Sequence, residues 1–365
     1  MSPGKLIKVL EVIDSLGSGG AESLLKNFVL EAKKNKLFNI EIATLYSNAI
    51  FKEEVKSAGI PVWGLNLEYK YDLRVIIKLI KLIKKRKYDI VHVHLFPANI
   101  FAALASLFLP KKIKWIFSEH NIYNRRRSFK IFKIIDSFTY SRYLNIVCVS
   151  KQVQSTLLSW MPSVKGKTKV IPNAVPVPEF LSPNLLKIYD ILFVGRLTQA
   201  KGIDVLLKAI KILKNKYSKN LKIAIVGDGE LKENLTTLTV ALGVNREVKF
   251  LGVRKDIDEL MLSSKTFVLP SRWEGLPMVV LEAMSRGMSI IATTVGGIPE
   301  VIESGKEGIL ISPENPEALA QAINDLLENE ELQKKLRQAA YKKVREKYSI
   351  DTYSIHMLDF YKSLV

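Results

Sequence analysis

Cysteine is almost absent from this chain of 365 residues, which contains only Cys148. A single cysteine cannot form an internal disulfide, and this scarcity is typical of proteins that fold in a reducing compartment. The chain also lacks any set of cysteines and histidines with the spacing of a zinc site. We therefore predict no disulfide, no metal site and a cytoplasmic location.

Long hydrophobic runs are also missing. The first apolar run, residues 6–16, is interrupted by Lys8, Glu11 and Asp14, which argues against a secretory signal peptide. The most apolar stretch, Leu95–Leu109, has 15 residues, whereas a helix needs about 20 to cross a bilayer. We expect this stretch to form a buried helix rather than a membrane span.

Two motifs of other enzymes are present only in part. The glycines between Leu16 and Glu22 lack the G-x-G-x-x-G spacing of a dinucleotide site, so we do not predict NAD. A ligand phosphate or acceptor could still approach the backbone of Gly19 and Gly20. The sequence Asp256-Ile-Asp258 has the D-x-D pattern of metal-dependent sugar transferases. A helical pattern follows it, so we expect an N-terminal helix cap instead.

Acidic residues are scarce in the first half only. Residues 1–180 contain 29 Lys and Arg against 13 Asp and Glu, whereas residues 181–365 contain 26 against 23. This asymmetry predicts an anionic membrane surface or nucleic acid as a partner of the first half. Arg74–Lys87 favours an ordinary helix with a solvated basic face. For Arg125–Lys133, where Phe129 and Phe132 lie between basic residues, membrane contact is an equally good interpretation.

Apolar runs typical of strands alternate with helical patterns along the whole chain, which indicates parallel sheets built from βαβ units. Three prolines in Ile171–Pro178 interrupt this alternation and indicate a linker. We therefore predict an α/β protein with two Rossmann-like domains, residues 1–175 and 176–348, and ligands at the carboxyl ends of the strands. The predicted strands are Ile7–Ile13, Ile40–Tyr46, Ile90–His94, Lys114–Ser118, Ile146–Val149, Ile191–Val194, Leu221–Val226, Val248–Leu251, Thr266–Leu269, Ser289–Ala292 and Gly308–Ile311.

The segment from Glu274 to Glu282 carries the most chemical information. Two carboxylates flank a turn that contains Gly275, and Pro277 suits the first turn of a helix because its missing N–H leaves no bond unmade. The free amides from Met278 onward would form an anion site at the positive end of the helix dipole. A phosphate there, with hydroxyl groups on both sides, is the shape of a nucleotide sugar.

Other candidate ligand-binding residues follow predicted strands. Arg196 offers a planar fork for phosphate and Lys201 a point charge, although either alone would more often be a surface charge. His120 directly follows the strand Lys114–Ser118. His92 lies inside a strand, where the alternation of side chains favours burial.

Several ordered motifs together resemble the retaining glycosyltransferases of family 4, which have the GT-B fold. The resemblance covers nearly the whole chain. It is carried by Gly19–Glu22, Asp89–His94, Glu119–Asn121, Val149–Lys151, Ile171–Val175, Val194–Leu197 with Lys201 and Gly202, Gly227–Glu230, Pro270–Pro277, Leu281–Met284 and Gly296–Glu300.

This resemblance implies a role for each candidate residue. Arg196 and Lys201 would bind the donor diphosphate and neutralise the leaving group. Glu282 would accept hydrogen bonds from the ribose, and His120 would contact the transferred sugar near its 6-position. That sugar would be held by Glu274 and the backbone of Gly275, Leu276, Pro277 and Met278.

The resemblance also implies positions for the rest of the ligands. Gly19 and Gly20 would approach the phosphate and the acceptor, and the base would lie near Gly252–Arg254. The two domains would face each other across a cleft, and residues 349–365 would return to the first domain. The chain departs from the family at Ala174, where glycine is usual, and at Leu276-Pro277, where Phe-Gly is more common. The second departure would bear on the choice of sugar.

The expected activity is metal-independent, retaining transfer of a hexose or N-acetylhexosamine. The donor would be a nucleotide diphosphate sugar, with UDP as the expected nucleotide, and no other cofactor is expected. The acceptor would be a hydroxyl of a lipid-linked or cell-surface glycan at the inner face of the plasma membrane, with no nucleic-acid partner. Alternatives are a basic membrane- or nucleic-acid-binding scaffold with a degenerate transferase domain, and a phosphorylase or epimerase of similar fold.

Overall fold

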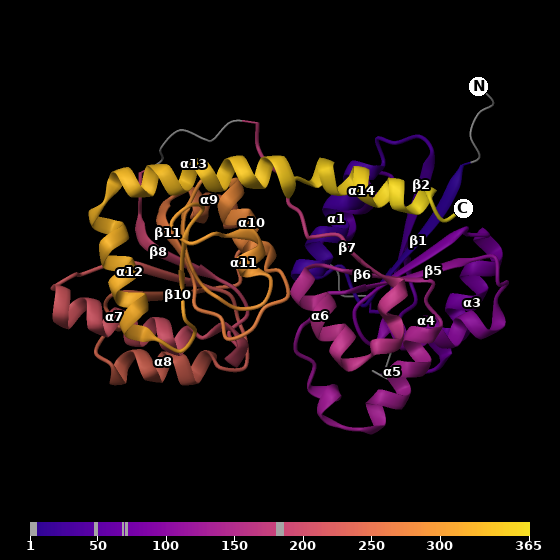
Figure 1. The fold of residues 1–365 in the computed structure, drawn as a ribbon, viewed down its shortest axis with the longest axis horizontal. Coiled ribbons are helices and arrows are strands. Elements are labelled where there is room, and N and C mark those ends of the chain that lie inside the picture. The colour runs from indigo at the N-terminus through magenta and orange to yellow at the C-terminus, as the bar shows by residue number, and fades with distance from the viewer. Residues whose placement is uncertain (1–5, 47–49, 68, 70–71, 180–185) are drawn as a thin grey trace. The chain divides into compact units, whose positions relative to one another are not determined.

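The computed structural model describes residues 6–46, 50–67, 69, 72–179 and 186–365. The chain divides into two compact units. The first consists of Met1–Ala174 together with Ile350–Val365, and the second of Val175–Ser349. Each unit is a parallel sheet with helices on its faces (Figure 1).

The sheet of the first unit has seven strands in the order β3-β2-β1-β4-β5-β6-β7. All of its neighbouring strands run parallel. In their register, Glu11 of β1 pairs with His92 of β4, and His94 of β4 pairs with Ser118 of β5. The strands are β1 Ile7–Ile13, β2 Phe38–Thr44, β3 Val62–Gly64, β4 Ile90–His94, β5 Lys114–Glu119, β6 Asn145–Cys148 and β7 Thr168–Val170.

The helices of the first unit include the last helix of the chain. Phe28 of α1 meets the rings of Tyr353 and Tyr361 of α14 edge-on, with ring centroids 5.6 and 6.2 Å apart. The predicted return of the C-terminal segment to the first unit is thereby confirmed. The helices are α1 Gly20–Ala32, α2 Lys52–Ser57, α3 Arg74–Arg86, α4 Ala98–Ala105, α5 Ile131–Ser141, α6 Lys151–Trp160 and α14 Ile350–Lys362, with 3-10 turns η1 Ser106–Phe108, η2 Arg125–Ser128 and η3 Pro162–Lys167.

The sheet of the second unit has six parallel strands in the order β10-β9-β8-β11-β12-β13. The order reverses at β8, and ligands of such open sheets bind beyond the carboxyl ends of the strands near a reversal of this kind. The strands are β8 Tyr189–Val194, β9 Ile223–Val226, β10 Val248–Gly252, β11 Ser264–Leu269, β12 Ser289–Thr293 and β13 Ile309–Ile311. The helices are α7 Ile203–Tyr217, α8 Lys232–Ala241, α9 Ile257–Leu262, α10 Met278–Ser285, α11 Ile298–Val301, α12 Pro316–Glu328 and α13 Glu330–Lys347, with the 3-10 turn η4 Gln199–Lys201.

The predicted strands all occur within a few residues of their expected bounds, and two more were missed. The missed strands, β3 and β7, have three residues each and lie at the edges of the first sheet. An edge strand bonds to one neighbour only and needs no long apolar run, so no sequence pattern marked them.

The apolar stretch 95–109 is only partly the buried helix that we expected. Its middle forms α4, in which Phe101 and the alanines are buried. Its end turns outward as η1, where Leu107 and Phe108 are 48% and 64% exposed. The α3 segment matches the expectation of an ordinary helix: Val75, Leu79 and Ile83 face the core.

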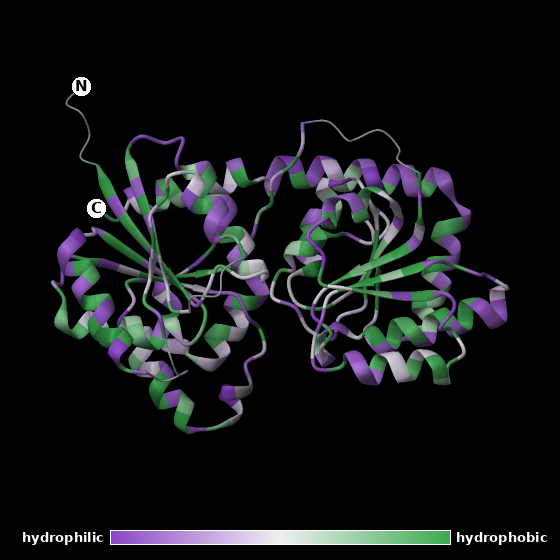
Figure 2. Cartoon of the chain, turned by 180° about the vertical axis from the view of Figure 1, so that it is seen from behind, coloured by the Kyte–Doolittle hydropathy of each residue, from purple (hydrophilic) through white to green (hydrophobic). Residues whose placement is uncertain are grey.

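The strands of both sheets are mostly hydrophobic, and the helices alternate between hydrophobic and hydrophilic residues (Figure 2). Parallel strands that are covered on both faces bury all their side chains, which explains these runs. The first sheet departs from this rule, because Glu11, His92, His94 and Glu119 are buried in its strands. Among the described residues, no helix is long and apolar enough to cross a membrane.

Candidate functional site

Glu274 and Lys201, two of the predicted site residues, form an ion pair in the second unit. The carboxylate oxygen Oε1 of Glu274 accepts hydrogen bonds from Lys201 Nζ and from Ser271 Oγ, each at 2.6 Å. The side chains of Glu274 and Lys201 are 10% and 19% exposed, so the pair is largely shielded from bulk water. Glu274 lies in the loop after β11, five residues beyond its last residue Leu269.

Two glycines allow the surrounding loops to approach this pair. Gly296 has a positive φ of 57°, and a Cβ there would collide with the carbonyl oxygen of Glu274. The next residue, Gly297, donates its N–H to the carbonyl of Gly275 at 2.7 Å. Gly202 has a φ of 61°, and a Cβ there would collide with the carbonyl oxygen of Pro270. The loops after β8, β11 and β12 are therefore held against one another by backbone contacts.

The helix after this loop begins one residue later than predicted. Pro277 is the N-cap, with extended backbone angles, and α10 starts at Met278. The prediction that Pro277 lies in the first turn is therefore wrong, because its ψ of 119° is not helical. The first-turn amides still begin at Met278 and can bind an anion. Leu276 is buried, and Glu282 is half-buried in the second turn of α10.

Arg196 and Arg254 differ in their surroundings. Arg196 follows β8 and is exposed, and no described residue forms an ion pair with it. Arg254, also exposed, donates from Nε and Nη2 to the two oxygens of Asp256, at 2.8 and 2.6 Å. The bonds from Arg254 lower the pKa of Asp256.

The D-x-D segment does not cap α9 as expected. Asp256 stands at the N-cap position but makes no capping hydrogen bond, because its carboxylate bonds to Arg254 instead. Asp258 bonds to Arg286 at 3.0 and 2.7 Å. Both aspartates are thus engaged by arginines.

Arg272 was missed by the sequence analysis. Its guanidinium donates to both oxygens of Asp204 at 2.9 Å and also to Glu314. The backbone N–H of Arg272 donates to the carbonyl of Ala200 at 2.7 Å. The hydrogen bonds that Arg272 donates to these carboxylates raise its pKa. Arg272 therefore ties the loop that carries Glu274 to the start of α7; its place inside the motif Pro270–Pro277 was the available signal.

In the first unit, Gly19 is the N-cap of α1 and Gly20 is its first residue. Gly19 is half-buried and Gly20 is exposed. A Cβ at Gly19 would collide with the carboxylate of Glu22. The missing side chain of Gly19 therefore leaves room for the Glu22 carboxylate at the amide end of α1.

His120 lies directly after β5 and is half-buried. Its Nε2 is 3.4 Å from Nδ1 of His94. Burial, reinforced by the neighbouring His94, lowers the pKa of His120 to about 3. The ring is therefore neutral at physiological pH.

His94 belongs to a buried polar cluster that the sequence analysis did not assemble. Glu11 Oε2 accepts from His94 Nε2 at 2.8 Å, and Glu11 Oε1 accepts from the Tyr361 hydroxyl at 2.6 Å. His92 contacts the same hydroxyl through Nδ1 at 2.5 Å and Ser118 Oγ through Nε2 at 2.8 Å. Burial, reinforced by the other histidines, lowers the pKa of His92 well below its usual range.

This cluster contains one set of side chains with metal-ligand chemistry. The ligand atoms of Glu11, His92 and His94 lie within 4.8 Å of one another. Every one of these atoms already has a hydrogen-bond partner in the protein, at 2.5 to 3.4 Å. We therefore describe the cluster as a hydrogen-bond network. A glutamate in the middle of the apolar run Ile7–Ile13 was the signal that could have revealed it.

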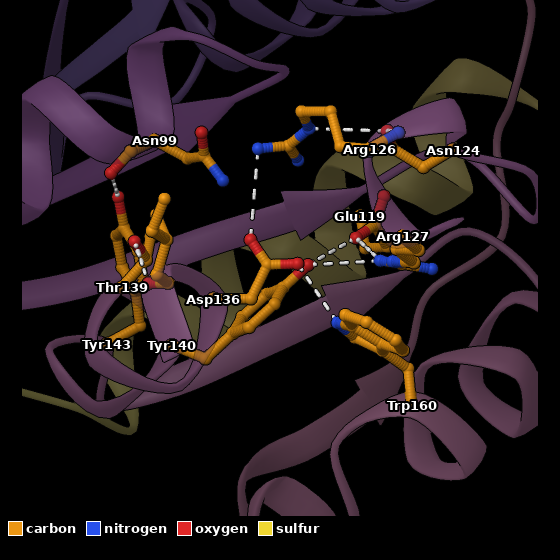
Figure 3. A network of polar contacts seen from close by, with 11 residues as sticks. Asn99, Glu119, Asn124, Arg126, Arg127, Asp136, Thr139, Tyr140, Tyr143 and Trp160 are labelled. Carbon is orange, nitrogen blue, oxygen red and sulfur yellow. Dashed lines mark hydrogen bonds and ion pairs between the residues drawn. The ribbon is translucent and has the colours of Figure 1, made fainter. Parts of the chain in front are cut away.

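A second buried network holds the loop that carries His120 (Figure 3). Glu119, at the end of β5, accepts from Arg127 Nη2 at 2.8 Å and from the Tyr140 hydroxyl at 2.6 Å. Its other oxygen accepts the N–H of Asn121 at 3.3 Å. Burial, together with the charge of Glu119, raises the pKa of Tyr140 well above its usual range.

The basic segment 125–133 is consequently less available to a membrane than its sequence suggests. Arg127 pairs with Glu119, and Arg126 stacks 3.8 Å from the ring centroid of Phe96 and lies 3.8 Å from Asp136. Both arginine side chains are at most 14% exposed. The outer surface of α5 and of the two residues before it carries instead two exposed lysines and four exposed apolar residues, which are Lys130, Lys133, Phe129, Ile131, Ile134 and Phe138.

Two family models match the chain. The model described as glycosyltransferase family 4 matches residues 18–178, and the model described as glycosyl transferases group 1 matches residues 183–343. The first covers most of the first unit and ends four residues beyond Ala174, whereas the second lies within the second unit.

Individual proteins match over most of the chain. An uncharacterized glycosyltransferase of Haemophilus influenzae is 30% identical over 334 residues, 88% of this chain and 90% of the relative. The UDP-Gal:alpha-D-GlcNAc-diphosphoundecaprenol alpha-1,3-galactosyltransferase of Escherichia coli is 27% identical over 338 residues, 87% of each chain. The structure of HepE from Anabaena with UDP and glucose has the same fold, with a TM-score of 0.85 at 20% identity over 98% of this chain and 100% of HepE.

Proposed function

Since this chain belongs to the family 4 glycosyltransferases and has the GT-B fold that its sequence predicts, we propose that it transfers a hexose or N-acetylhexosamine from a UDP-sugar. The acceptor is a hydroxyl of a lipid-linked or cell-surface glycan. The observation that carries the proposal is the Lys201–Glu274 pair, at 2.6 Å, beside the open amide end of α10 (Met278–Ser285). One ammonium, one carboxylate and a row of amides suit a donor with a phosphate and a sugar.

The relatives support the choice of donor and acceptor. The name of the Escherichia coli relative specifies a UDP-linked galactose donor and a diphosphoundecaprenol-linked acceptor. HepE was solved with UDP and glucose. We extend these chemical classes, and not the individual sugars, to this chain.

We assign the donor diphosphate to Lys201, Arg196 and the first-turn amides of α10. Positive charge at these positions neutralises the leaving phosphate without requiring a metal ion. Glu274 and the backbone of Gly275–Met278 hold the sugar. Glu282 holds the ribose, and Arg254 lies near the base, where its bonds to Asp256 keep its side chain in place.

We propose retention of anomeric configuration by same-face attack of the acceptor hydroxyl, assisted by the departing phosphate. The alternative, a covalent intermediate, requires Glu274 as the nucleophile. One oxygen of Glu274 already accepts bonds from both Lys201 and Ser271, which lowers its nucleophilicity and suits a binding role. Mass spectrometry of the enzyme trapped during turnover tests this step: a glycosyl adduct on Glu274 contradicts it.

The central test is calorimetric titration with a panel of UDP- and GDP-sugars, followed by transfer assays with a polyprenyl-diphosphate-linked sugar as acceptor. We expect a UDP-sugar to bind, and Lys201→Ala or Arg196→Ala to reduce transfer by about a hundredfold or more. Arg246→Ala removes one exposed positive charge from the amino-terminal edge of the same sheet, just before β10 (Val248–Gly252). It should leave transfer unchanged. Full activity of both site variants contradicts the assignment.

We further propose that the enzyme works at the cytoplasmic face of the membrane and contacts anionic lipid through α5 (Ile131–Ser141). A lipid-linked acceptor must be reached at the bilayer surface. Three apolar residues of this helix, Ile131, Ile134 and Phe138, are 40 to 69% exposed, and Lys133 lies among them, as interfacial helices require. Phe129 and Lys130, just before the helix, are exposed as well.

Vesicle sedimentation tests this contact. Binding to vesicles with phosphatidylglycerol should exceed binding to neutral vesicles, and Ile134→Ala with Lys133→Ala should reduce it several-fold. The matched control is Ile355→Ala on α14, which removes another isoleucine, 60% exposed compared with 69% for Ile134. Equal and negligible binding to both kinds of vesicle contradicts the membrane proposal and leaves the donor assignment intact.

A further inference from the structure

The buried cluster around Glu11 has a definite hydrogen-bond direction. An ionised carboxylate only accepts, so both neighbours of Glu11 must donate to it. The Tyr361 hydroxyl donates its single proton to Oε1 of Glu11, at 2.6 Å, and His94 donates from Nε2 to Oε2 of Glu11, at 2.8 Å. Glu11 is fully buried and retains no contact with water that could replace these bonds.

The direction continues along His94 to His120. A neutral imidazole that carries its proton on Nε2 has an unprotonated Nδ1, which accepts. The Nδ1 of His94 faces the Nε2 of His120 at 3.4 Å, so His120 must supply the proton between them. Its own Nδ1 is then unprotonated, and no described residue bonds to that atom.

We propose that Glu11 and His94 are positioning residues that hold His120 as its Nε2–H tautomer, so that its Nδ1 accepts a hydrogen bond from a hydroxyl of the ligand. This rests on the proposed function for the identity of that ligand, a sugar hydroxyl. The lowered pKa of His120, to about 3, agrees with a ring that does not become an imidazolium at neutral pH.

The sheet register explains how three strands build this chain of hydrogen bonds from Glu11 through His94 to His120, which we call the relay. Glu11 of β1 pairs with His92 of β4, and His94 lies two residues further along β4, on the same face. His120 follows the last residue of the neighbouring strand β5. It lies two residues beyond Ser118, which is the register partner of His94. Tyr361 reaches Glu11 from the C-terminal helix α14, so the returning end of the chain completes the network.

The side branch through His92 provides a control. His92 bonds to Tyr361 and Ser118 and does not lie between Glu11 and His120. Removing the Tyr361 hydroxyl breaks one bond to Glu11 but preserves the bond from Glu11 to His94. A change that merely loosens the buried cluster can thus be separated from a change that breaks the relay.

The direct test is the tautomer of each histidine, read from the nitrogen chemical shifts of the full chain labelled with 15N-histidine. The chain has four histidines, which keeps assignment tractable. At pH 8, where an unperturbed imidazole is neutral, we expect the wild-type His94 and His120 each to carry the proton on Nε2. A proton on Nδ1 of His120 overturns the proposal, and this measurement requires neither a variant nor a donor.

Variants then test the path. Glu11→Leu should shift His120 toward the tautomer mixture of free histidine. His94→Gln, which keeps Glu11 but interrupts the hydrogen bonds between Glu11 and His120, should do the same. Tyr361→Phe should leave the His120 tautomer unchanged. An unaltered His120 in both Glu11→Leu and His94→Gln overturns the relay. Circular dichroism confirms that each variant folds before it is compared.

Ligand binding provides the second measurement. Fluorine cannot donate a hydrogen bond, so wild-type enzyme should bind UDP-6-deoxy-6-fluoroglucose about three- to tenfold more weakly than UDP-glucose. In Glu11→Leu the ratio should approach one, whereas Tyr361→Phe should retain it. An equal ratio in wild type and Glu11→Leu contradicts the relay. Failure of any UDP-sugar to bind contradicts the proposed function instead and leaves the tautomer result standing.

Discussion

The two units hold their polar residues in different places. In the second unit, Lys201, Ser271 and Glu274 lie in loops beyond the strands, and their bonds link one loop to another. In the first unit, Glu11 and His94 lie inside the strands, and their bonds cross the sheet. Polar groups in loops remain within reach of a ligand, whereas polar groups inside a sheet could act on a ligand only through an intermediate residue, as we propose for His120.

The two arrangements also depend differently on burial. The side chain of Glu274 is 10% exposed and that of Lys201 19%, while Glu11 is fully buried and Glu119 is 4% exposed. A buried charge that loses its partner is strongly destabilising, because desolvation is no longer offset. Changes in the first unit should therefore act mainly on stability, and changes in the second mainly on binding.

The largest expected effect is the loss of the carboxylate of Glu119. Glu119→Ala leaves the buried guanidinium of Arg127 unpaired and should lower the opening free energy of β5 and α5 by about 3–5 kcal/mol. Native-state hydrogen exchange on peptides of these elements measures it. Combining it with Arg127→Leu should recover part of the loss, since no unpaired charge then remains; a double variant as unstable as the single one would refute this explanation.

Gly296→Ala tests whether the close backbone contact between two loops of the second unit supports UDP-sugar binding, without changing any charge. The positive φ and the collision with the carbonyl oxygen of Glu274 should destabilise the loops by about 2 kcal/mol or more. UDP-sugar binding should weaken in parallel, as calorimetry can show. Gly243→Ala, also at positive φ but with open space around its Cβ position, separates backbone strain from the collision. Equal effects of the two substitutions would rule out a role for the collision.

Acid should weaken the first unit, because His92 and His120, whose pKa values burial lowers, both lie in it. His120 has a folded pKa of about 3, below the ordinary value of 6.5. Between these values the unfolded chain binds a proton that the folded chain does not, so stability falls as the pH decreases through this window. From pH 7 to pH 5 this group should contribute a loss of about 1–2 kcal/mol. Hydrogen exchange gives the opening free energy of β5 at pH 7 and at pH 5. The loss between the two pH values should be smaller in His120→Gln than in wild type, and equal losses would contradict the assignment.

The smallest effect is expected for a surface ion pair of the second unit. Glu303 and Lys306 are 68% and 62% exposed and 3.2 Å apart. Glu303→Gln should change the opening free energy by less than about 0.5 kcal/mol, because water and salt screen such pairs. Hydrogen exchange of the segment after α11 measures it, and a loss comparable to that of Glu119→Ala would break the contrast between buried and exposed charges.

Much of the fold could be predicted because parallel strands covered on both faces must be apolar along their whole length. That rule located the strands from Ile7–Ile13 to Gly308–Ile311. It missed β3 and β7, where three residues at a sheet edge carry no such pattern. It also placed all of Leu95–Leu109 inside, whereas Phe108 turns outward at the end of η1.

The candidate site could be predicted only where its chemistry is local. Glu274 to Glu282 is one continuous segment, and its motif indicated a phosphate and sugar site from nine residues. The assignment of Asp256 as a cap was wrong, since a nearby arginine competed for the carboxylate and the sequence does not rank such competitors. The ion pair between Lys201 and Glu274 was not anticipated, because it joins loops 73 positions apart.

The sequence by itself determined the two parallel sheets, the family and the candidate donor-binding motif, because each follows from hydrophobic periodicity or from short contiguous patterns. Only the tertiary structure decided which partners the buried polar groups have and in which direction their hydrogen bonds run. Glu11 and Tyr361 are 350 positions apart and meet because α14 returns to the first unit. Hydrogen-bond direction depends on which donors surround a carboxylate in space, and that neighbourhood exists only after the strands have paired.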